Sequence, residues 1–169
     1  MPGSITLGAG QTVTCTFTNT RQTGKLEVKK SLSPSNDPGK FNLFIKGSTG
    51  ASTVASALNV GDTGTTGATT LNTGIYQVSE TAGTSTSLSV YTSSISCVNR
   101  SDSSAVTSGS GPGPLSVNVL NNSDIVCTIT NVRGQGKLTV NKVLVPSTDP
   151  ARFNPLLLKS TGVPLTLVT

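Results

Sequence analysis

One block of this sequence occurs twice, at an offset of 112 residues, and this repeat constrains the fold more than any other feature. Residues 13–42, VTCTFTNTRQTGKLEVKKSLSPSNDPGKFN, align without a gap on residues 125–154, IVCTITNVRGQGKLTVNKVLVPSTDPARFN. A period of this size is too long for a solenoid and is typical of a small domain repeated in tandem. Turn residues at 21–24 and 133–136 mark the joints. We therefore predict terminal strands of a preceding repeat at 1–23, a complete repeat at 24–133 and the first strands of a truncated repeat at 134–169.

Alternating apolar residues within the complete repeat predict short strands. The alternation includes Leu26/Val28 and continues in runs separated by turn-like segments at 34–39, 61–67 and 108–114. About seven strands in about 110 residues indicate an all-β, antiparallel, immunoglobulin-like sandwich. A disordered Ser/Thr-rich linker is the alternative, but regularly spaced apolar residues oppose it. The remaining alternating positions are 41/43/45, 76/78, 88/90, 115/117/119 and 125/127/129.

Composition excludes several functions. The chain has no His, so imidazole base chemistry and the commonest metal ligand are absent, and we expect neither an enzyme nor a metal site or other cofactor. The net charge of +5 comes from scattered basic residues without interleaved aromatics, which does not indicate nucleic-acid binding. No apolar run reaches membrane-spanning length. The sequons at Asn99 and Asn121 are interpreted as chance matches.

The repeat assigns different roles to the three cysteines. Cys97 and Cys127 fall on the apolar faces of two strands of the complete repeat, and we predict a disulfide between them. Cys15 is the equivalent of Cys127, and its partner would precede Met1, so we expect it to be unpaired. A disulfide implies an oxidising, extracellular compartment. Three buried reduced thiols are the alternative.

Three polar residues share the inward parity of their strands: Lys30, Glu80 and Asn131. The other glutamate, Glu27, has outward parity. A buried lysine becomes a neutral nucleophile, and a buried carboxyl group can hold a proton at neutral pH. The amine of Lys30 could then attack the Asn131 amide while Glu80 shuttles the proton, forming an isopeptide bond with loss of ammonia. Alternatively, Lys30 extends to the domain edge as an ion-pair partner of Glu80, Asn131 caps its strand, and a register slip lets Lys29 compete.

The segments GKLEVKK, GIYQVSET and CTITNV, in this order, resemble the prealbumin-like, collagen-adhesin B-type (SpaA-like pilin) domains of bacterial surface proteins. This resemblance implies an autocatalytic bond between Lys30 and Asn131 with Glu80 as the catalytic residue. It further implies an extracellular stalk or fibre module whose partners are neighbouring repeats or identical subunits. An adhesin domain binding a host or glycan ligand is the alternative.

The two partial repeats are complementary. Asn19 is the equivalent of Asn131, and Lys142 is the equivalent of Lys30. Residues 1–23 of one copy could therefore complete residues 134–169 of the next and build a filament head-to-tail. The apolar run 155–158 would otherwise be exposed. Truncation of a longer array is the simpler explanation.

Overall fold

The computed structural model describes residues 3–153, so the apolar run at 155–158 lies outside the described residues. The chain divides into two units, residues 1–134 and 135–169. Within the described residues, no strand lies before Thr23 or after Arg133. The elements are β1 (Thr23–Ser33), β2 (Phe41–Gly47), β3 (Thr53–Val60), β4 (Thr69–Asn72), β5 (Gly74–Ala82), the 3-10 helix η1 (Leu88–Val90), β6 (Tyr91–Asn99), β7 (Ala105–Ser110), β8 (Leu115–Val119) and β9 (Asp124–Arg133).

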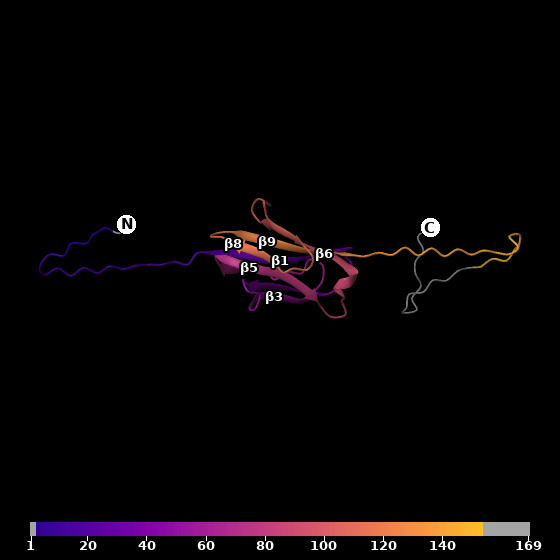
Figure 1. The fold of residues 1–169 in the computed structure, drawn as a ribbon, viewed down its shortest axis with the longest axis horizontal. Helices are drawn as coiled ribbons and strands as arrows, with labels where there is room; N and C mark the ends of the chain where they lie inside the picture. Colours follow the sequence, from indigo (N-terminus) through magenta and orange to yellow (C-terminus); the bar gives the residue numbers. More distant parts are fainter. Residues whose placement is uncertain (1–2, 154–169) are drawn as a thin grey trace. The chain divides into compact units, whose positions relative to one another are not determined.

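These strands form two sheets that stack face to face as a sandwich, which confirms the predicted fold class (Figure 1). One sheet has the order β4-β1-β9-β6-β7, and the other has the order β3-β2-β5-β8. All pairs are antiparallel except β1 with β9, which run parallel from Lys25 opposite Asp124 to Ser33 opposite Val132. The first and last strands of the unit therefore lie side by side in the middle of one sheet.

The core lies between the sheets and is aliphatic. Its largest fully buried side chains come from β1, β2, β5, β6, β8 and β9, where alternation turns every second residue inward. Phe41 is the one aromatic residue among the buried hydrophobic side chains of the described chain. Each inward position predicted on β1, β2 and β9 is buried, namely Leu26, Val28, Phe41, Leu43, Ile45, Ile125, Cys127 and Ile129.

Two local predictions were wrong. Leu88 and Val90 form η1 instead of a strand, because an alternation of only three residues also fits a single helical turn before β6. The predicted turn at 108–114 begins only at Gly111, since β7 continues to Ser110 and pairs with Ser94 of β6. The strands β3, β4 and β7 were not predicted.

Candidate functional site

Lys30 reaches the inside of the sandwich from the inward face of β1. Its Nζ lies 3.0 Å from Oε2 of Glu80 on β5, and both side chains are fully buried. The same Nζ donates a hydrogen bond to the carbonyl oxygen of Ile129 on β9, also at 3.0 Å. It lies 4.5 Å from the centre of the Phe41 ring. The amine therefore lies between the two sheets, out of contact with water.

Burial controls the charge of this amine. Removal from water is the largest influence and lowers the pKa of Lys30, while the negative charge of Glu80 offsets part of the shift. The Lys30–Glu80 contact has the length of an ion pair, but neither oxygen of the carboxylate makes a hydrogen bond of good geometry. The two groups are therefore close enough to exchange a proton, and the carboxylate oxygens have no hydrogen-bond partner.

Asn131 lies on β9 beside this pair. Lys30 is opposite Ile129 in the parallel register, and Asn131 is the next inward residue along β9. Strand spacings place the Cα atoms of Lys30 and Asn131 about 8 Å apart, a span that a lysine and an asparagine side chain can bridge. Asn131 is completely buried, and neither its Nδ2 nor its Oδ1 has a hydrogen-bond partner. All three polar residues that share inward parity are thus buried between the sheets.

The alternative to the isopeptide placed Lys30 at the domain edge and Asn131 as a cap of its strand. The observed contacts of these two residues differ from that arrangement in two respects. The Lys30 side chain is fully buried and does not reach the domain edge, and the Asn131 amide caps nothing. Lys29 is opposite Thr128 and faces outward, with 45% of its side chain exposed. The ion pair between Lys30 and Glu80 is present, as that alternative expected.

A disulfide joins Cys97 to Cys127, which are directly opposite on β6 and β9. The predicted pairing is confirmed, and the alternative of three reduced thiols is wrong. Cys15 is a free and exposed thiol. Asn19 and Lys142, which the repeated sequence aligns with Asn131 and Lys30, are exposed. The Nζ of Lys142 lies 4.5 Å from the centre of the Phe153 ring, the same contact that Lys30 makes with Phe41.

Glu27 is buried although its parity is outward. Thr65 donates a 2.6 Å hydrogen bond to its carboxylate, and Arg100 covers it with an ion pair. Burial is the largest influence and opposes ionisation, but the contacts with Thr65, Arg100 and Lys29 together outweigh it and lower the pKa of Glu27. Alternation identifies the face of a strand, but it cannot show that a loop from another part of the chain covers that face.

A second polar cluster was also not predicted from the sequence. Arg133 at the end of β9 contacts Asp37 and Tyr91, and Tyr91 donates to Asp37. The repeat contains a signal for it, because Arg21 and Asp149 occupy the positions of Arg133 and Asp37. Tyr91 lies in the part of the repeat that occurs once.

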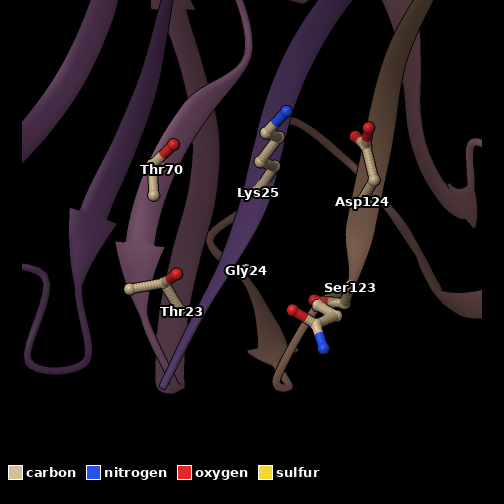
Figure 2. A pocket seen from close by; sticks show the side chains of 7 residues that line it. Thr23, Gly24, Lys25, Thr70, Ser123 and Asp124 are labelled. Carbon is tan, nitrogen blue, oxygen red and sulfur yellow. The ribbon is translucent and has the colours of Figure 1, made fainter. Parts of the chain in front are cut away.

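A pocket with a volume of about 260 Å³ lies at the start of β1. Lys25 and Asp124 line it from neighbouring strands (Figure 2). Its other lining residues are Thr23, Gly24, Thr70, Asn122 and Ser123. Between residues 3 and 153, no group of three or more metal-ligating side chains comes together. None of the helices in that part of the chain is long and apolar enough to cross a membrane.

Comparison with known proteins identifies a family. The sequence matches the prealbumin-like fold domain over residues 2–21 and 25–133. Similar solved structures include the major pilin protein T-13 of Streptococcus pyogenes, 13% identical, with 67% of this chain and 46% of that chain covered and a TM-score of 0.41. Another is a major pilin of the same organism, 16% identical, with 66% and 48% covered and a TM-score of 0.33.

The chain thus spans about half the length of these pilins. Comparison with curated proteins gives no match. The residues that match the family include both sheets of the sandwich, and with them Lys30, Glu80 and Asn131. The chain belongs to the family of prealbumin-like fold domains.

Proposed function

We propose that this chain is a structural module of an extracellular bacterial fibre or stalk, and that its complete repeat is stapled by a Lys30–Asn131 isopeptide bond in addition to the disulfide. The observation that carries the proposal is the buried Lys30–Glu80 pair beside an asparagine amide without a hydrogen-bond partner. The disulfide supports an oxidising compartment outside the cytoplasm.

The first step of the proposed reaction is a proton transfer. Transfer from Nζ of Lys30 to the carboxylate of Glu80, 3.0 Å away, converts the ion pair into a neutral amine and a carboxylic acid. The amine attacks Cγ of Asn131 while the acid donates its proton toward the amide oxygen and stabilises the charge that develops there. Glu80 then carries a proton from Nζ to Nδ2, and the Cγ–Nδ2 bond breaks. The products are a secondary amide joining Nζ to Cγ and one molecule of ammonia. Glu80 ends as the carboxylic acid that the first proton transfer formed, and it becomes a carboxylate again when it gives this proton to the departing ammonia.

The unreacted site is energetically unfavourable, and the reaction relieves it. A buried polar group without a hydrogen bond costs about 1–3 kcal/mol, and Asn131 has two such atoms. A buried ion pair is further penalised by desolvation of both partners. The product replaces the charged amine and the primary amide with one neutral amide. The folded sandwich therefore favours the bond and supplies the proximity that the attack needs.

The partial repeats extend the proposal to assembly. Val13, Cys15 and Phe17 have the spacing of the three apolar inward residues of β9, and Val13 and Phe17 are exposed. Residues 1–23 of one copy therefore have the side-chain pattern needed to complete residues 134–169 of another by adding a strand. Size-exclusion chromatography tests this step: concentration-dependent oligomers are expected, and a monodisperse monomer at all concentrations contradicts it.

Intact mass spectrometry of the full chain, with and without reductant, tests the isopeptide. We expect a mass one ammonia below that of the disulfide-bonded sequence, and we expect Glu80→Gln and Asn131→Ala to abolish the loss. Glu27→Gln is the matched control, because it changes the only other glutamate, and it should retain the loss. A wild-type mass that shows the disulfide but no loss of ammonia refutes the isopeptide.

The adhesin function is a second candidate, and the polar pocket of Figure 2 is the observation that favours it. Hydroxyl, amide and charged side chains at its rim are groups that bind sugars. A glycan screen with the full chain tests this candidate, with Lys25→Ala as the variant that should lose any signal. Binding unaffected by that substitution excludes the pocket as the ligand site.

A further inference from the structure

Three side chains form a closed polar cluster where β9 ends. Nη1 of Arg133 lies 3.2 Å from Oδ2 of Asp37 and donates to the hydroxyl oxygen of Tyr91 at 2.9 Å. The Tyr91 hydroxyl donates to Oδ1 of Asp37 at 2.5 Å. The backbone N–H of Gly39 donates to the same oxygen, and the Asp37 side chain is only 2% exposed. Each member thus contacts the other two, which fixes the geometry.

This cluster ties together three elements that surround the candidate site. Asp37 belongs to the loop that follows β1, Tyr91 is the first residue of β6, and Arg133 is the last residue of β9. Strand ends fray unless they are held. Asn131 lies two residues before this end, and its amide makes no hydrogen bond that could orient it. Its position therefore depends on how firmly the end of β9 is held.

The cluster also packs against the ring that covers the amine. The ring centres of Tyr91 and Phe41 lie 5.3 Å apart in an edge-to-face arrangement. Nζ of Lys30 lies 4.5 Å from the centre of the same Phe41 ring. Arg133 and Lys30 are thus connected through two packed aromatic side chains.

We infer that Arg133, held by Asp37 and Tyr91, is a positioning residue that aligns Asn131 with the amine of Lys30 for bond formation. The inference rests on the proposed isopeptide. Arg133 touches neither reacting group, and its effect passes through the backbone of β9. A displacement of about 1 Å can slow a positioned reaction by about 100-fold, so loss of this anchor should slow the reaction strongly.

The repeat supplies independent support. Arg21 and Asp149 stand at the equivalents of Arg133 and Asp37 in the two partial repeats. A unit assembled from residues 1–23 and 134–169 would therefore contain the arginine and the aspartate of the cluster together with Asn19 and Lys142. Two of the three cluster members, the arginine and the aspartate, therefore accompany the reacting pair in both copies.

The rate of ammonia loss tests the inference. The full 169-residue chain is made in a short cell-free pulse, and its intact mass is followed with time. Arg133→Ala should slow the loss about tenfold or more. Arg100→Ala is the matched control, because Arg100 forms an ion pair with Asp124 at the first residue of β9 and has similar exposure, 40% against 44%. That variant should react at the wild-type rate.

Stability is measured separately, in chains that also carry Asn131→Ala and cannot form the bond. A slower reaction in Arg133→Ala, at a stability equal to that of Arg100→Ala, supports positioning. If Arg133→Ala fails to fold, Tyr91→Phe and Asp37→Asn replace it, and each should slow the loss. Equal rates in all variants, or slowing that follows stability alone, overturn the inference and leave the isopeptide intact. A wild-type chain that never loses ammonia refutes the proposed isopeptide itself.

Discussion

The disulfide between Cys97 and Cys127 should provide a large part of the stability of the β-sandwich. The two cysteines are 30 residues apart. In the chain-entropy model, closing a loop of this size restricts the unfolded state and stabilises the fold by about 3.6 kcal/mol at 25 °C. Total stabilities of small domains are about 5–15 kcal/mol. Reduction should therefore move the domain close to the limit of stable folding.

Urea unfolding of oxidised and reduced chains measures this difference. The chains carry Asn131→Ala, so that no isopeptide contributes, and Cys15→Ser, so that the exposed thiol cannot exchange with the buried pair. Both cysteines of the disulfide are at most 1% exposed, so reduction requires unfolding first. We expect a lower midpoint and a larger denaturant dependence after reduction, because the open unfolded chain exposes more surface.

A chain with both Cys97→Ala and Cys127→Ala is the control and should not respond to the reductant. A difference below about 1 kcal/mol between oxidised and reduced forms would refute the loop-entropy reasoning. In that case the aliphatic core alone would maintain the sandwich.

Three further predictions concern the fold around the site. Ile129→Ala should cost about 2–5 kcal/mol in urea unfolding because Ile129 is completely buried beside Lys30, and a cost below 1 kcal/mol would contradict the packing described. Gly24→Ala should cost about 1–3 kcal/mol because a Cβ there would lie 2.6 Å from Oγ of Ser123, whereas the equivalent Gly136→Ala, with open space, should be neutral. Burial is the largest influence on Asp37 and opposes ionisation, but its hydrogen bonds and the charge of Arg133 lower the pKa of Asp37 below its ordinary value. The ionised Asp37 therefore stabilises the fold above pH of about 4, and this contribution is lost as the pH falls through the lowered pKa. Asp37→Asn should remove this part of the acid dependence of unfolding. An unchanged pH profile of unfolding in that variant would exclude a contribution from Asp37.

Alternation alone identified the inward position of Lys30 and Asn131, because on strands buried on one face the parity of apolar neighbours fixes where each side chain points. It failed on β3, where the small residues Ala55 and Ala57 pack against the core while Val54 and Leu58 are exposed. At this edge strand two of the larger apolar residues, Val54 and Leu58, are exposed, so the apolar pattern does not identify the inward face.

The contacts that connect distant parts of the chain could not be predicted. The cover that Thr65 and Arg100 place over Glu27 depends on the sheet order, which is a tertiary property. The parallel pairing of β1 with β9 is of the same kind, because nothing local distinguishes a parallel from an antiparallel neighbour.

That parallel pairing has a mechanical consequence. Since β1 and β9 run in the same direction, the chain enters the unit at Thr23 and leaves it at Arg133 at opposite ends of the pair. Tension between these two residues pulls the strands past each other along their length. The hydrogen bonds from Lys25–Asp124 to Ser33–Val132 are then loaded in shear and resist together, instead of opening one after another as in a zipper.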